Sequence, residues 1–161
     1  MRFILTNLAI IIALTLTSFA QKEMKVEWVR HIEGEGNVRI YNFKMDKDEN
    51  FFMSGYFENN ISYPNYSQFY GIGGQSLFWI KMDKNGKFDN MKFYSSNEMK
   101  YGHLTFTFFN DNSIILNGAF DKKIVLDSNT TLINNGWERD IFISKVSKNG
   151  YFEWTRHIHG P

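Results

Sequence analysis

The sequence predicts an all-β protein made of antiparallel, four-stranded units. Three observations predict this fold class: an internal repeat, short apolar stretches separated by polar turns, and an Asn-Gly pair between two of these stretches in each repeat. No stretch after residue 23 shows a convincing helical period of about 3.6 residues, so we expect little or no helix. The 161 residues are 43% hydrophobic and 22% charged, as in ordinary globular proteins.

Residues 1–20 have the features of a secretory signal peptide. Arg2 is the only charged residue among them, an apolar run follows, and small residues precede the expected cleavage point after Ala20. The apolar run is shorter than the roughly 20 residues that a membrane-spanning helix needs. We therefore expect a mature chain of residues 21–161 that is secreted or held in the cell envelope, with no membrane span after cleavage.

Composition excludes several classes of protein. The chain has no cysteine, which excludes disulfides, thiolate zinc sites and cysteine nucleophiles. Its 18 basic and 17 acidic residues give a formal net charge of +1, and this balance argues against nucleic acid as a partner. An exported chain without cysteine must be held together by its core alone.

Two near-identical segments lie at opposite ends of the expected mature chain. Trp28–Gly34 (WVRHIEG) recurs as Trp154–Gly160 (WTRHIHG), with five of seven positions identical and an offset of 126 residues. Halfway between them, Asn90 occupies the position of the two tryptophans. We expect the Trp154 segment to be a strand packed with Phe142 in the core, and the Trp28 segment to be a strand at an edge.

Two further matches have half of this offset. The segment that begins at Ser76 recurs from Asp140 at an offset of 64, and the one around Gly55 recurs around Gly118 at 63. Independent matches that share one period indicate a repeat protein. Residues 21–161 then form one repeat region, with repeat 1 at about 35–96 and repeat 2 at about 97–160.

Each repeat is expected to contain four strands, because apolar and β-branched runs alternate with polar turns. In repeat 1 they are Val38–Met45, Phe51–Phe57, Leu77–Met82 and Lys87–Tyr94. In repeat 2 they are Leu104–Phe109, Ser113–Phe120, Asp140–Val146 and Tyr151–Ile158. The turns between the first two strands are 46–50 and 110–112, and Asn85-Gly86 and Asn149-Gly150 join the last two, where tight hairpins need residues that tolerate positive φ.

The third strand of each repeat is apolar on both faces. Leu77 and Trp79 point to one face, and Phe78, Ile80 and Met82 point to the other. The equivalent residues of repeat 2 are Ile141 and Ile143 on one face and Phe142 and Val146 on the other. Such sheets are covered on both sides, and a four-stranded antiparallel sheet between like sheets is a blade of a β-propeller. The sequence thus predicts a partial β-propeller of two blades plus an N-terminal strand, with an inserted loop or short hairpin at 58–75.

This pattern resembles the bacterial SBBP-type β-propeller repeat over nearly all of residues 26–160. The matching residues are Trp28, Gly34, Asn50, Gly55, Phe57, Phe78, Lys81, Gly86, Asn112, Gly118, Phe120, Asp140, Phe142, Lys145, Gly150, Trp154 and Gly160. Ser76 and Asn90 depart from it, because the pattern has Asp and Trp there. The resemblance implies an exported, repeat-containing surface or extracellular protein and implies no particular activity.

Two blades do not close a propeller, which has about four to eight. Three alternatives stay open: the chain is a fragment of a longer protein with further repeats or an unusually short gene product, several copies close a shared propeller as a homo-oligomer, or the two blades form a self-contained stack. Uncovered apolar faces would favour association.

The histidines offer little evidence of a metal site. His31 and His157 occupy equivalent repeat positions, which indicates shared packing. His157 and His159 could hold a metal on one strand face, but the sequence suggests no third ligand.

Other motifs have simple structural interpretations. Asp46, Asp48 and Asn50 have the spacing of the start of a calcium loop, but Phe51 and Phe57 stand where that loop needs glycine and glutamate, so we interpret them as an Asx turn. The glycine-rich stretch 71–74 is not followed by the helix that a phosphate loop needs. We assign no catalytic residue, no metal ligand and no cofactor.

One segment has the composition of a binding loop. Tyr63, Tyr66, Phe69 and Tyr70 alternate with polar residues, and Trp137 lies in the equivalent segment of repeat 2. Aromatic rings beside amides can stack on sugars and bond hydroxyl groups; the alternative is that these rings cover the edge of a blade. We expect a non-enzymatic, exported binding or adhesion module for a glycan or a protein. The alternatives are a structural part of a larger secreted propeller protein and a secreted propeller-scaffold hydrolase or lyase.

Overall fold

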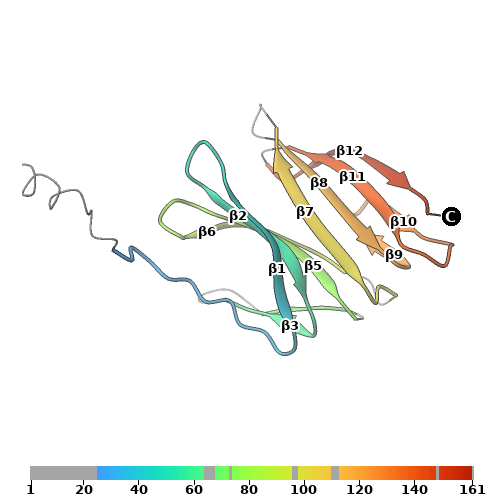
Figure 1. The fold of residues 1–161 in the computed structure, drawn as a ribbon, viewed down its shortest axis with the longest axis horizontal. Coiled ribbons are helices and arrows are strands. Elements are labelled where there is room, and N and C mark those ends of the chain that lie inside the picture. Colours follow the sequence, from blue (N-terminus) through green and yellow to red (C-terminus); the bar gives the residue numbers. More distant parts are fainter. Residues whose placement is uncertain are drawn as a thin grey trace, which may run out of the picture.

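The computed structural model describes residues 25–63, 68–72, 74–95, 98–109, 113–147 and 149–160, and these residues form an all-β protein (Figure 1). Its strands pair in antiparallel fashion in two four-stranded sheets and two short hairpins, and neither sheet closes on itself within the described part of the chain. No described segment is a helix that could cross a membrane.

Sheet 1 has the strand order β1-β2-β5-β6, and its strands are β1 (Val38–Met45), β2 (Phe51–Phe57), β5 (Ser76–Met82) and β6 (Phe88–Tyr94). Sheet 2 has the strand order β12-β11-β8-β7, and its strands are β7 (Gly102–Phe108), β8 (Ile114–Phe120), β11 (Asp140–Val146) and β12 (Phe152–Ile158). All eight expected main strands are confirmed, with ends that differ by at most two residues. Each sheet is therefore a sequential meander.

A short hairpin is inserted between the second and third strands of each sheet. These hairpins are β3 (Asn60–Ile61) with β4 (Phe69–Tyr70), and β9 (Lys123–Val125) with β10 (Thr131–Ile133). The extra hairpin expected within 58–75 is confirmed, and its counterpart in the second repeat occupies the same place in the strand order. Both project from the ends of the main strands (Figure 1).

The turns are stabilised in the way that the sequence indicates. The Asp46 carboxylate accepts hydrogen bonds from the backbone N–H groups of Asp48 at 2.9 Å and Asn50 at 2.8 Å, which confirms the Asx turn. Gly86 and Gly150 have φ of 71° and 82°, a left-handed conformation that favours glycine. The expected turn at 110–112 lies outside the described residues.

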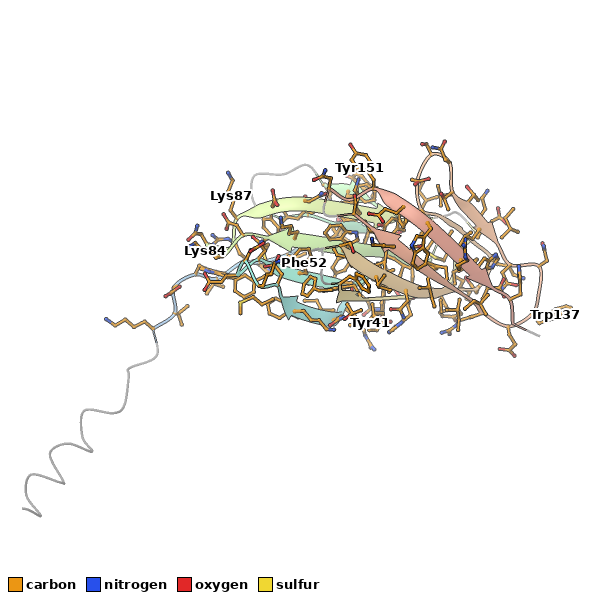
Figure 2. All side chains as sticks on the ribbon, turned by 90° about the horizontal axis from the view of Figure 1, so that it is seen from above. Tyr41, Phe52, Lys84, Lys87, Trp137 and Tyr151 are labelled. Atoms are coloured by element: carbon orange, nitrogen blue, oxygen red, sulfur yellow. The ribbon has the colours of Figure 1, made fainter. Side chains whose placement is uncertain are left out.

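Sheets 1 and 2 pack face to face, and the faces in contact are called their inner faces. Leu77 and Trp79 of β5 lie in one apolar cluster with Leu104 and Phe106 of β7. The Ser54 hydroxyl also donates to the carbonyl oxygen of Leu104 at 2.9 Å. Figure 2 shows Phe52, another member of this cluster, between the layers. Burial of each such side chain contributes about 1.5–3 kcal/mol, so this interface is a principal part of the core.

The outer face of sheet 1 holds a second apolar cluster. Its buried residues are Met53, Phe57, Ile61, Tyr63, Phe78, Ile80, Met82 and Phe88. Trp28 and Ile32 pack against it from the N-terminal side. The expectation that the third strand of repeat 1 is covered on both faces is confirmed.

The expected N-terminal strand is not formed. Trp28–Gly34 runs along sheet 1 as an irregular segment, and its backbone pairs only at Glu33, which exchanges two hydrogen bonds with Ser62. A strand needs a continuous ladder partner, whereas this segment is held by side chains. The indole N–H of Trp28 donates to the carbonyl oxygen of Lys84 at 3.1 Å, and its ring meets Phe51 edge to face at 5.3 Å.

Only the inner face of sheet 2 is covered by described residues, so the expectation that the third strand of repeat 2 is covered on both faces is wrong. On its outer face Ile141 is 46% exposed, Ile158 48% and Trp154 38%. The expectation that Trp154 packs with Phe142 is therefore wrong. Phe142 pairs with His157, and Trp154 lies three positions away from His157, so the alternation of side chains along β12 turns the indole to the outer face.

Leu77 and Ile141 occupy equivalent repeat positions but differ in burial, at 0% and 46% exposure. Leu77→Ala should lower the free energy of unfolding by about 2–5 kcal/mol because it leaves a cavity in a packed core. Ile141→Ala should cost clearly less at low protein concentration. Guanidinium denaturation of both variants checks this, and equal losses would contradict the asymmetry between the sheets.

Candidate functional site

Two of the aromatic residues expected to bind a ligand pack against sheet 1, one of them buried and the other partly buried. Tyr63 is only 8% exposed, and its ring lies 4.4 Å from that of Phe88. Phe69 stacks on Phe93 with ring centroids 3.9 Å apart. Tyr66 lies outside the described residues. These contacts favour the alternative in which Tyr63 and Phe69 cover the edge of the sheet.

The other two expected residues are at the surface. Tyr70, at the end of β4, is 66% exposed, and its hydroxyl donates to the side-chain oxygen of Gln68 at 2.9 Å. Trp137, between β10 and β11, is fully exposed at 100%. Figure 2 shows Trp137 at one end of the molecule, with Lys84 and Lys87 at the other. A tryptophan in this setting contributes nothing to the core.

A buried asparagine holds the loop that carries Trp137. Asn134 is 4% exposed, and its backbone N–H donates to the carbonyl oxygen of Lys122 at 2.7 Å. Its side-chain oxygen accepts from the N–H of Gly136 at 2.6 Å, and its side-chain nitrogen donates to the carbonyl oxygen of Glu138. The loop is thus bound on both sides of Trp137 to one side chain, which fixes the turn that presents the indole.

A cluster of possible metal ligands lies at the end of the β11–β12 hairpin. Asp140 begins β11, His157 lies near the end of β12, and His159 follows that strand. One carboxylate oxygen of Asp140 lies 2.7 Å from Nε2 of His157 and 3.1 Å from Nδ1 of His159. The three ligand atoms all lie within 4.8 Å of one another. Two imidazoles and a carboxylate on one hairpin form a set that binds divalent transition metals.

The environment of Asp140 favours its ionised form. Burial disfavours the charge, but the backbone N–H of Gly160 and the side chains of His157 and His159 outweigh it and lower the pKa of the carboxyl group. The second carboxylate oxygen accepts the hydrogen bond from Gly160 at 2.9 Å. Asp140 is therefore a buried carboxylate with a hydrogen-bond partner at each oxygen. Its two histidine partners lie between it and the surface.

The two equivalent histidines do not share their packing, so that expectation is wrong. The side chain of His31 is 74% exposed and lies 3.3 Å from the Glu33 carboxylate. The side chain of His157 is 17% exposed, because β12 pairs with β11 and places it against Asp140. The third ligand could have been found from hairpin register, since an antiparallel pair brings the start of one strand to the end of the next.

A third group of polar side chains lies where β1 meets β7. The rings of Tyr41 and His103 are 4.2 Å apart, and the guanidinium of Arg139 lies 5.5 Å from the ring of Tyr101. Burial and the positive charge of Arg139 lower the pKa of His103. Burial, and then the neighbouring Tyr56, raise the pKa of the Tyr41 hydroxyl.

Comparison of the chain with family models, curated proteins and solved structures found no match.

His103 should make stability depend on pH. Its pKa in the folded state lies below the ordinary value of about 6.5, so the folded state favours the neutral ring. This contribution is complete above that value and is lost as the pH falls through the lowered pKa. The free energy of unfolding should therefore fall less between about pH 7.5 and 5 in His103→Gln than in the parent chain.

Urea denaturation across that pH range measures the effect. The exposed His31 provides the matched control as His31→Gln. A His103→Gln variant with the parent's pH dependence would refute this role for the ring.

Proposed function

We propose that the chain is an exported, non-enzymatic binding module whose two sheets are propeller-like blades and whose ligand is a glycan or a protein surface. Two features support the architecture: each sheet is a sequential four-stranded antiparallel meander, and the two sheets pack face to face in one layer order. Equivalent inserted hairpins support a common blade plan, in which connecting loops carry the contacts with a ligand.

The observation that carries the binding function is the full exposure of Trp137 on a loop fixed by Asn134. An indole offers a large flat apolar surface that stacks on sugar rings or on apolar protein side chains. Because the loop is already ordered, binding loses less conformational entropy than it would with a flexible loop. Tyr70, exposed at the corresponding hairpin of sheet 1, offers a second aromatic contact.

A glycan array with the labelled protein tests this proposal. Trp137→Ala should weaken binding to any glycan retained by the parent at least about tenfold, as for an aromatic hot spot, and leave the unfolding midpoint unchanged. Asn134→Ala should weaken binding and also lower the free energy of unfolding by about 1–3 kcal/mol, because it leaves buried backbone groups unpaired.

Tyr151→Ala is the matched control, since Tyr151 is 72% exposed and lies away from Trp137 (Figure 2). Retained binding by Trp137→Ala would refute the role of the indole. Turnover of a bound glycan would overturn the non-enzymatic proposal.

A second candidate function is binding of a divalent transition-metal ion by Asp140, His157 and His159. The geometry that favours it is the convergence of two imidazole nitrogens on one buried carboxylate oxygen. In a bound state the two nitrogens would give up their hydrogen bonds to that oxygen and face the ion together with it, and the exposed side of His159 leaves room for water or another ligand.

Titration calorimetry with Zn²⁺ tests this candidate. The parent chain should bind one ion, and Asp140→Asn or His159→Ala should weaken binding at least about tenfold, since loss of an outer partner of a metal ligand alone costs about that much. His31→Ala is the matched control, because His31 lies beside Glu33 but has no such cluster. Equal affinities for the parent and His159→Ala would exclude this site.

A further inference from the structure

Sheets 1 and 2 contact each other through their inner faces. Their outer faces carry the two surfaces that a second contact of the same kind requires. The repeat makes this comparison possible, because every residue of the sheet 1 strands except Tyr41 at the β1 bulge has a counterpart in sheet 2 at an offset of 63 or 64. The outer face of sheet 2 is the counterpart of the inner face of sheet 1. The outer face of sheet 1 is the counterpart of the inner face of sheet 2.

The outer face of sheet 2 has the residues of a buried interface but is exposed. Ile141 is 46% exposed, whereas its counterpart Leu77 is completely buried against sheet 2. Ile158 of β12 is 48% exposed beside it, and Trp154, 38% exposed, lies further along the same face of β12, opposite Lys145. Ile158 and Ile141 form an apolar pair on neighbouring strands, and Trp154 lies on the same face beyond Arg156. Such surfaces mark protein–protein contact sites.

The outer face of sheet 1 is open along β1. Ile40 is 54% exposed and Phe43 is 53% exposed. Their counterparts on β7 are Leu104 and Phe106, which are 0% and 4% exposed because sheet 1 covers them. The open part of this face also contains a mainly apolar hollow, lined by Arg30, Ile32, Val38, Ile40, Met53 and Phe78. On the inner face of sheet 2 the equivalent side chains of β7 are not exposed, because Leu77 and Phe52 of sheet 1 pack against them.

The turn between the third and fourth strands of each sheet is a specific contact site, here called the seat, for side chains of an earlier segment of the chain. Trp28 lies so close to Gly86 that a Cβ atom on this glycine would come within 2.7 Å of the indole. Arg30 donates to the carbonyl oxygens of Asn85 and Gly86 in the same turn. In the second repeat, Asn90 holds the equivalent place beside Gly150, at 3.3 Å from such a Cβ.

Trp154 and Arg156 stand at the third copy of these repeat positions. They correspond to Trp28 and Arg30 in the near-identical segments WTRHIHG and WVRHIEG. Both are exposed, and Arg156 donates to the carbonyl oxygen of the adjacent Thr155, in the way that Arg30 also donates to Val29. No glycine turn lies over Trp154 among the described residues. A turn that fits such side chains exists in the same chain: the turn at Gly86.

We propose that two copies of this chain associate head to tail: the outer face of sheet 2 of one copy docks on the outer face of sheet 1 of the next. Ile141 packs on the outer face of sheet 1 beside Ile40, and Trp154 and Arg156 replace Trp28 and Arg30 at the turn of Gly86. The Trp154–Gly160 segment of the first copy then occupies the place of Trp28–Gly34 in the second copy.

The Trp28–Gly34 segment therefore acts as an internal competitor for the docking site. It can be displaced because it forms no strand and most of its residues are exposed. The five identities in seven residues explain why one seat fits both segments. Head-to-tail contacts use two different surfaces, so each added copy offers a further site, and the series ends when the rotation between copies closes a ring. A ring of about four to eight blades takes about two to four copies with two blades each.

Sedimentation equilibrium of the purified full chain tests the proposal with complementary variants. The parent should show a mass that rises with concentration above that of one chain. Trp28→Ala combined with Arg30→Ala should strengthen association at least about tenfold, because it frees the seat. Ile141→Asp and Phe43→Asp should each weaken it at least about tenfold, because each places a charge in one of the two surfaces.

The decisive measurement is a mixture of Ile141→Asp and Phe43→Asp. Each variant alone lacks one surface, but together they retain one intact interface and should form a dimer and nothing larger. Ile133→Asp, at a 53% exposed residue of the β9–β10 hairpin, is the matched control and should associate like the parent. Circular dichroism confirms that each variant is folded. A single-chain mass for both the parent and the Trp28→Ala, Arg30→Ala variant would overturn the proposal and leave the face to another partner.

Discussion

The burial of β5 on both faces is the constraint on which the rest of the structure depends. Ser76, Leu77, Phe78, Trp79 and Ile80 are five consecutive residues with at most 4% exposure. A strand of this kind has no face that can turn to water, so two other parts of the chain must cover it. Sheet 2 covers one face, and the β3–β4 hairpin with the Trp28–Gly34 segment packs on the other. Segments 50 or more residues apart in sequence are thereby brought together around this strand, as the bonds from Trp28 to Lys84 and from Ser54 to Leu104 show.

The same constraint explains why two similar repeats have unequal surroundings. β11 has nearly the residue pattern of β5, yet its exposure alternates, because it has a neighbouring sheet on one side only. Burial is therefore a property of the position in the stack and not of the strand's own sequence. The Trp segments show this most clearly: one indole packs against Phe51 and a glycine turn, while the other, in a near-identical sequence, stands on an exposed face.

Strands and turns were predictable from the sequence because they depend on local chemistry. Runs of apolar residues define the eight main strands. Asp46 determines its turn through a side-chain acceptor, and Gly86 and Gly150 determine theirs through positive φ. What the sequence did not predict depends on which strand lies beside which. The outward direction of Trp154 follows from its pairing with Lys145, and the contact of Asp140 with His157 follows from the register of β11 with β12. The burial of Tyr63, which the sequence left as one of two alternatives, follows from the contact of its ring with Phe88.

The segment from Asn134 to Asp140 differs most from its counterpart in the first repeat. In the first repeat Tyr70 and Ser76 stand at these two positions, and Ser76 is buried at the start of β5. In the second repeat both positions hold buried polar residues with several hydrogen-bonding groups, at 4% and 2% exposure. Buried polar groups need hydrogen-bond partners, and here the partners lie in surface segments. Asn134 bonds to the loop of Trp137, and Asp140 bonds to His157 and His159. Two buried side chains six residues apart thus hold an exposed indole and an exposed imidazole in fixed places. This difference is the reason why the proposed ligand contacts centre on the second repeat.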